Sequence, residues 1–108
     1  MFALNKPNPV IVCVEDDADI QMLLSVYISK AMGVHPVFLK DSKEAFHFLG
    51  LSDPSSIENA DLIIMDYQIP GMDGITAIKK IRESSVYTDT PIIMITASDD
   101  QKILEIRH

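Results

Sequence analysis

The stretch "LIIMDYQIPGMDG", Leu62 to Gly74, joins an apolar run to an aspartate and then to a turn. A short, continuous apolar run is typical of a parallel strand that is covered on both faces, and we predict a strand over residues 61–65. Asp66 follows the run directly, and the "PGMDG" segment after it has the composition of a tight turn. The sequence therefore places a carboxylate at the carboxyl end of a buried strand.

Three further segments have the same character as this strand. The run "PVIVCV" covers residues 9–14, "HPVFL" covers residues 35–39, and "PIIMITA" covers residues 91–97. Each is short and largely apolar, and the first run is also rich in valine, which favours strands. We predict four strands in all.

The segments between these strands have apolar residues at the spacing of a helix. After the first strand, apolar residues recur with the period of an amphipathic helix. They are Ile20, Leu23, Leu24, Tyr27, Ile28 and Ala31, and Gly33 is the expected end of this helix. Asp41, with Glu44 three places on, predicts the start of a second helix. A third helix should present Ile75, Ile78 and Ile81 to the core. The "GLSDPSSIEN" segment reads as a partly helical loop, and "SDDQKILEIRH", residues 98–108, should begin a fourth helix, with acids in its first turn.

Strands that alternate with helices indicate an α/β domain with a parallel sheet and right-handed crossovers. The 108 residues, 47% of them hydrophobic, suit one domain with one core, and we assign residues 1–108 to it.

Composition excludes several classes of function. Sixteen acidic residues against nine Lys and Arg give a formal charge of −7, which would repel a nucleic-acid backbone. Cys13, the single cysteine, lies in an apolar run and is predicted to be a small buried residue. No apolar run approaches the ~18 residues of a membrane span, and the first residues lack the apolar core of a signal peptide. We expect a cytoplasmic protein that binds neither nucleic acid nor membrane.

Polar residues end three of the predicted strands: Glu15 and Asp16 after the first, Asp66 after the third, and Thr96 in the fourth. The carboxyl ends of parallel strands share one edge of a sheet, where ligands bind. Clustered carboxylates raise one another's pKa unless a cation lies among them. With oxygen ligands alone, a hard ion such as Mg²⁺ fits better than zinc.

Each of these residues has a simpler interpretation when taken alone. An acidic run before a helix usually caps that helix, and we assign Asp17 and Asp19 to this role. A lone Asp after a strand is usually a turn residue, and a lone Thr in a strand is usually structural. The ordered combination of all three strand ends favours a site.

The segments "VCVEDDADI", "LIIMDYQIPGMDG" and "PIIMITASDD" together resemble the receiver domain of two-component response regulators. The resemblance covers nearly the whole chain and implies a flavodoxin-like, doubly wound sheet with strand order 2-1-3-4, the family's fifth strand and helix being missing. It implies that Asp66 is the phosphoacceptor for a sensor histidine kinase or phosphotransfer protein.

The resemblance also implies roles for the neighbouring residues. Asp16 would bind Mg²⁺ directly, Glu15 through water, and Gln68 through its backbone carbonyl. Thr96 would turn its hydroxyl towards the phosphoryl group, beside the small Ala97, and Pro70 and Gly74 would shape the turn after Asp66. The expected function is a switch rather than an enzyme.

The chain departs from the family pattern at its carboxyl end. The family has a lysine and a switch aromatic on a fifth strand, and the sequence ends before either; Lys102, on the predicted fourth helix, is not assigned the lysine's role. The fourth strand would then be an exposed edge, through which we expect homodimers or instability. Two explanations remain open: the chain is a piece of a longer receiver protein, or a partner chain covers the edge.

Two rival functions remain. A degenerate receiver that binds partners without phosphorylation is favoured by the missing lysine and opposed by the complete acidic set. A Mg²⁺-dependent phosphohydrolase with an aspartyl nucleophile fits poorly, because Glu15 stands at the nucleophile position, two residues before Asp17.

Overall fold

The computed structural model describes residues 7–51, 59–97 and 102–107, and of residues 96–97 and 102–107 it describes only the backbone. The predicted loop after the second helix falls largely on residues 52–58, outside the described part of the chain. The helices are α1 (Ala18–Met32), α2 (Ser42–Phe48), α3 (Gly74–Arg82) and the 3-10 turn η2 (Ser85–Tyr87). The strands are β1 (Ile11–Val14), β2 (Val37–Leu39), β3 (Leu62–Asp66), β4 (Gln68–Ile69), β5 (Met72–Asp73), β6 (Ile92–Ala97) and β7 (Lys102–Arg107).

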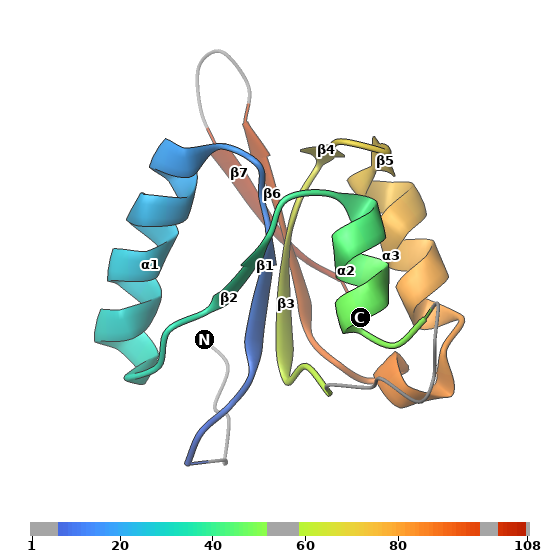
Figure 1. Ribbon diagram of the computed structural model, residues 1–108, viewed down its shortest axis with the longest axis horizontal. Coiled ribbons are helices and arrows are strands. Elements are labelled where there is room, and N and C mark those ends of the chain that lie inside the picture. Colours follow the sequence, from blue (N-terminus) through green and yellow to red (C-terminus); the bar gives the residue numbers. More distant parts are fainter. Residues whose placement is uncertain (1–6, 52–58, 98–101, 108) are drawn as a thin grey trace.

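The main sheet has the strand order β2-β1-β3-β6-β7, and its first four strands are parallel. This order confirms the predicted sequence 2-1-3-4 and the flavodoxin-like, doubly wound fold. The sheet forms the central layer, with α1 on one side and α2 and α3 on the other (Figure 1). The four parallel strands therefore end at the same edge, which is the upper edge in Figure 1.

The two faces of the sheet have separate apolar cores. Alternate residues of each strand point to opposite faces. Towards α2 and α3, a large buried cluster includes Val12, Met65 and Ile81. A smaller cluster, which includes Cys13 and Ile28, fills the space beneath α1. Burial on both faces explains why β1 and β3 read as continuous apolar runs.

The helix ends follow the predicted capping residues. The Asp17 carboxylate accepts hydrogen bonds from the backbone N–H groups of Asp19 and Ile20, and Gly33 ends α1 in the left-handed conformation at φ 71°. Asp41 caps α2 by accepting from the N–H of Glu44 at 2.8 Å. These caps confirm the predicted starts of the first two helices.

The predicted fourth helix is wrong over residues 102–107, and the rest of its predicted span, residues 98–101 and 108, lies outside the described residues. Residues 102–107 form β7, which pairs antiparallel with the whole of β6, from Ile92↔Arg107 to Ala97↔Lys102. The prediction that β6 is an exposed edge is therefore also wrong, and with it the basis for dimers through that strand. Unpaired backbone groups along a sheet edge are costly, and a segment with Ile103, Leu104 and Ile106 suits a strand.

The predicted inner face of α1 is only partly right. Leu24 and Ile28 pack towards the core beneath α1, but Leu23, Tyr27 and Ala31 are exposed. The predicted helix is confirmed, but these exposed residues do not belong to the face that packs on the sheet. Among the described residues, no helix combines the length and apolar character that a membrane span requires.

Candidate functional site

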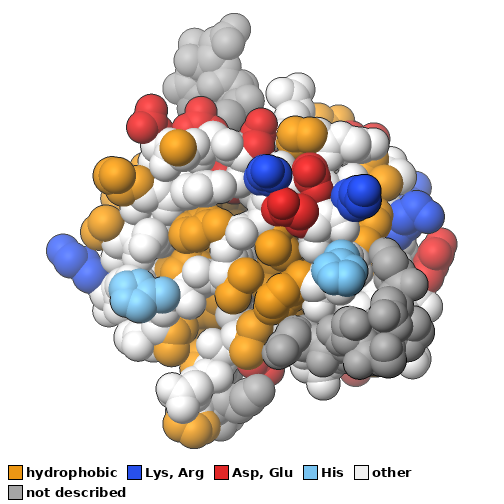
Figure 2. Space-filling view, in the orientation of Figure 1, with side chains coloured by type: hydrophobic (Ala, Val, Ile, Leu, Met, Phe, Trp, Pro, Cys, Tyr) orange, Lys and Arg blue, Asp and Glu red, His pale blue; other side chains and the backbone are white. Residues whose placement is uncertain are grey.

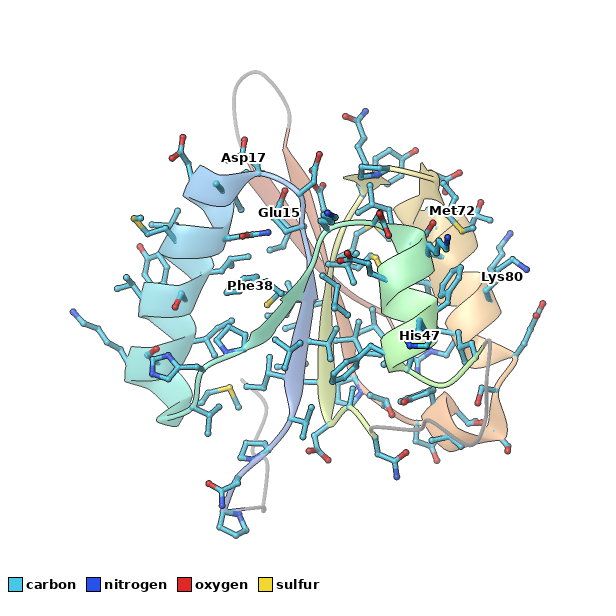
Figure 3. All side chains as sticks on the ribbon, in the orientation of Figure 1. Glu15, Asp17, Phe38, His47, Met72 and Lys80 are labelled. Carbon is cyan, nitrogen blue, oxygen red and sulfur yellow. The ribbon has the colours of Figure 1, made fainter. Side chains whose placement is uncertain are left out.

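Three carboxylates meet at the upper edge of the sheet. Glu15 and Asp16 follow the end of β1, and Asp66 is the last residue of β3. One carboxylate oxygen from each of the three lies within 4.8 Å of the others. Figure 3 labels Glu15 at this edge, next to the start of α1. The structure thus brings together the three carboxylates that the sequence predicted to converge.

A pocket of ≈ 270 Å³ opens at this edge. Its lining residues are Glu15, Asp16, Asp17, Ile20, Asp66, Tyr67 and Gln68. The predicted site residue Gln68 is therefore part of the pocket, and Tyr67 and Ile20 are additions that the sequence did not suggest. Within the described part of the chain, this lining contains acids but no basic side chain.

Backbone and side-chain hydrogen bonds fix Glu15 in place. Its N–H donates to the Leu39 carbonyl at 2.9 Å, and its carboxylate Oε2 accepts from the N–H of Asp17 at 3.0 Å. The Gln21 side chain donates through Nε2 to the Glu15 carbonyl at 2.6 Å. Gln21 was missed from the sequence, although its position one turn into α1 is the signal that could have identified it.

Two hydrogen bonds donated by backbone N–H groups of the residues after Asp66 fix its position. The N–H of Tyr67 donates to the Ile95 carbonyl at 2.8 Å, and the N–H of Gln68 donates to Asp66 Oδ1 at 3.2 Å. In the parallel register, Asp66 lies beside Ile95, so the backbone of Thr96 lies at the end of β6 beside the site. The predicted role of the Thr96 hydroxyl concerns a side chain outside the described residues.

The position of Gly74 depends on close backbone contacts. Gly74 begins α3, and its N–H donates to the Tyr67 carbonyl at 2.6 Å. A Cβ added there would lie 2.8 Å from the Asp66 carbonyl oxygen and 2.9 Å from Tyr67 Cα. Only glycine lets α3 start this close to the end of β3, which explains the glycine that ends the "PGMDG" turn.

The electrostatics of the site are dominated by Glu15, which is only 2% exposed. Burial raises the pKa of Glu15 from 4.5 to about 7; the hydrogen bond from Asp17 opposes the rise, and the neighbouring Asp66 and Asp16 add to it. Burial also raises the pKa of the Cys13 thiol, to about 12, so Cys13 remains protonated, as predicted for a buried structural residue.

A pH-dependent stability follows from the raised pKa of Glu15. The unfolded chain loses this proton near pH 4.5 and the folded chain near pH 7. Between these values the folded state binds more protons, so the free energy of unfolding decreases as the pH rises through this window. Glu15→Gln, which mimics the protonated side chain, should stabilise the metal-free protein by about 1–2 kcal/mol at pH 8 and by almost nothing at pH 4.5.

Urea unfolding of both proteins in EDTA, at pH 4.5 and at pH 8, measures this difference. Glu83→Gln removes an exposed carboxylate at the end of α3, away from the acidic pocket. It should show no such pH-dependent increase in the free energy of unfolding. Equal stability of wild type and Glu15→Gln at pH 8 would contradict the argument.

The donor set fits a hard divalent cation. Carboxylate oxygens from Glu15, Asp16 and Asp66 lie close enough to share one ion. Burial and mutual repulsion of these groups are unfavourable without positive charge, and oxygen ligands are those preferred by Mg²⁺. The three residues could therefore hold Mg²⁺, as the sequence predicted.

Comparisons with known proteins agree with this geometry. The family model of the response regulator receiver domain matches residues 11–106. The chain is 35% identical over 91 residues to the uncharacterized transcriptional regulatory protein YclJ of Bacillus subtilis (strain 168), covering 84% of this chain and 36% of that protein. It is 32% identical over 92 residues to the phosphate regulon transcriptional regulatory protein PhoB of Escherichia coli (strain K12), covering 85% of this chain and 37% of that protein.

Comparison with solved structures supports the same fold. The chemotaxis response regulator CheY4 of Vibrio cholerae matches with a TM-score of 0.70 and 27% identity, over 86% of this chain and 72% of that one. The chain thus spans little more than a third of the two regulatory proteins, and most of the chemotaxis protein. The family match covers both strand ends of the acidic pocket, and the chain belongs to the response regulator receiver domains of two-component systems.

Proposed function

We propose that the chain accepts a phosphoryl group on Asp66 from a sensor histidine kinase or phosphotransfer protein. The observation that carries the proposal is the convergence of Glu15, Asp16 and Asp66, which line one pocket and offer carboxylate oxygens within 4.8 Å of one another. Asp16 and Asp66 would hold Mg²⁺ directly, together with the backbone carbonyl of Gln68, and Glu15 would act through water.

The transfer asks little covalent chemistry of the protein. A carboxylate oxygen of Asp66 attacks the phosphorus of a phosphohistidine; the new O–P bond forms as the N–P bond breaks, and its electron pair returns to the imidazole nitrogen. Mg²⁺, when bound, supplies positive charge that offsets the charge on the transferring oxygens. The hydrogen bond from Gln68 to Oδ1 orients the Asp66 carboxylate in the pocket.

The product is a switch state. The aspartyl phosphate adds negative charge and acceptor oxygens at the sheet edge, and the Thr96 hydroxyl would bond to one of them. The chain is then the acceptor of the phosphoryl group, and we do not assign it an enzymatic turnover of its own.

Incubation of the protein with Mg²⁺ and acetyl phosphate, followed by intact mass spectrometry, tests the proposal. The expected result is a mass increase of one phosphoryl group that requires Mg²⁺ and is lost on treatment with hydroxylamine, which cleaves acyl phosphates. Beryllium fluoride should bind at the same residues without transfer. Absence of both modification and binding would rule the proposal out.

A second candidate, a receiver that binds partners without phosphorylation, is favoured by the absence of any basic side chain from the pocket lining in the described residues. Titration with Mg²⁺ separates the two functions. Saturable shifts of the Asp66 and Gln68 amide resonances support the phosphoacceptor. Unchanged resonances, with partner binding retained, support the second candidate.

A further inference from the structure

The outer face of α1 carries an apolar patch that none of the described residues covers. Four large side chains on it are largely exposed: Met22 at 70%, Leu23 at 49%, Val26 at 50% and Tyr27 at 64%. Only two other large hydrophobic side chains among the described residues are exposed, one beside the acidic pocket and one on η2. Contiguous exposed apolar surface on a folded domain marks an interaction site.

Helical geometry places these four residues on one stripe. At about 100° per residue, Met22, Val26, Leu23 and Tyr27 fall within an arc of about 140°. Leu24 and Ile28, which pack towards the sheet, lie on the opposite side of the helix. The core beneath α1 is therefore filled by other side chains of the helix, and the described residues leave the stripe uncovered.

Two opposite charges flank the stripe along its centre line. Asp19 lies one turn before Met22, and Lys30 lies one turn after Tyr27; both are exposed. Within the described residues, neither the Asp19 carboxylate nor the Lys30 ammonium has an ion-pair partner. Figure 2 shows the same order along the outer side of α1 at the left, with acidic atoms at the top, hydrophobic ones below them and basic atoms lower down.

The arrangement is symmetric about a point between Leu24 and Ser25. A two-fold axis through that point, perpendicular to the helix, relates the position of Asp19 to that of Lys30. It likewise relates Met22 to Tyr27 and Leu23 to Val26. A face with this property is complementary to itself when two copies of the helix meet antiparallel. Two-fold interfaces in homodimers have this self-complementary character.

We propose that the chain forms an antiparallel homodimer through the outer face of α1. The apolar stripes of the two copies pack together, and Asp19 of each copy pairs with Lys30 of the second copy. This interface is separate from the edge of the sheet, where β7 covers β6. One helix face buries less area than the roughly 1,600 Å² of a standard interface, so the dimer should be weak and concentration-dependent. The proposal does not depend on phosphorylation of Asp66.

Charge reversal tests the antiparallel pairing directly. Asp19→Lys and Lys30→Asp each place like charges opposite one another twice in every dimer, and each should weaken self-association in sedimentation velocity by about tenfold or more. Glu83→Lys and Lys43→Asp make the same changes of charge at exposed positions, directly after α3 and on α2, and should leave self-association unchanged.

Mixing the two variants provides the decisive measurement. The Asp19→Lys chain has lysine at both positions and the Lys30→Asp chain has aspartate at both, so an equimolar mixture should regain dimers as heterodimers. A misfolded variant could not produce this recovery. A mixture that stays monomeric, variants that associate as strongly as wild type, or a wild type that is monomeric at ~1 mM, where weak interfaces still associate, would overturn the proposal.

A heterologous partner gives a different result. If wild type does not self-associate but Val26→Lys abolishes binding of the phosphoryl-donor protein, the stripe is a docking surface for that donor and the homodimer is rejected.

Discussion

Asp66→Asn is expected to reduce phosphoryl labelling by acetyl phosphate and Mg²⁺ to background. The amide lacks the anionic oxygen that would attack phosphorus, and the chain offers no second carboxylate in the same position on β3. Intact mass spectrometry of the wild type and the variant, under identical conditions, measures the loss. We expect the largest effect from this variant because it removes the anionic carboxylate that reacts.

The same variant should remain folded and become slightly more stable without metal. Asp66 raises the pKa of the neighbouring Glu15, so its carboxylate opposes ionisation of that buried group. Its removal relieves this repulsion, and the free energy of unfolding above pH 7 should rise by about 1 kcal/mol. Loss of labelling together with unchanged or higher stability would exclude unfolding as the cause.

Asp16→Asn is the matched control for Asp66→Asn. It also removes one carboxylate from the pocket but leaves the proposed nucleophile in place. We expect labelling to persist at higher Mg²⁺, with the Mg²⁺ affinity roughly tenfold weaker. Full labelling of Asp66→Asn, or complete loss in both variants at saturating Mg²⁺, would contradict the assignment of Asp66 as acceptor.

The convergence of the three carboxylates could be predicted from the sequence because parallel strands end at one edge of a sheet. Once β1 and β3 are recognised as continuous apolar runs, the residues that follow them must be neighbours. The burial of Glu15 and the rise in its pKa could not be predicted in the same way. They depend on the contacts of one side chain with its surroundings rather than on its place at a strand end.

The carboxyl-terminal segment shows where local patterns fail. Two acids before an apolar stretch favour a helix, yet residues 102–107 pair with β6. The deciding factor is the row of backbone donors and acceptors along β6, which a neighbouring strand satisfies and a helix does not. The sequence did reveal the need for a partner at that edge, but not that the chain itself provides it.

On α1, the apolar period was a reliable guide to the helix and a poor guide to its buried face. Leu23 and Tyr27 fit the pattern as well as Leu24 and Ile28 do, because a helix with apolar residues on two faces has no unique inner side. The packing of Leu24 and Ile28 on the sheet decides between them. Leu23 and Tyr27, which the core leaves exposed, are part of the proposed dimer face.

Gly74→Ala is expected to be strongly destabilising. The added Cβ would lie 2.8 Å from the Asp66 carbonyl oxygen, 2.9 Å from Tyr67 Cα and 3.2 Å from the Tyr67 carbonyl oxygen. All three are backbone atoms that cannot rotate away, so α3 must move from the end of β3. Such overpacking should lower the free energy of unfolding by about 2–3 kcal/mol, or the melting temperature by about 10–20 °C.

The displacement should also reach the acidic pocket, because the clashing atoms belong to Asp66 and Tyr67. We therefore expect Gly74→Ala to weaken Mg²⁺ binding as well as stability. Gly33→Ala is the control: its φ of 71° makes alanine unfavourable by about 1 kcal/mol, but no atom lies within 4 Å of the added Cβ. Urea unfolding and Mg²⁺ titration of the two variants separate backbone strain from a clash at the site. Equal losses of stability, with Mg²⁺ affinity unchanged in both, would show that α3 can shift without disturbing Asp66.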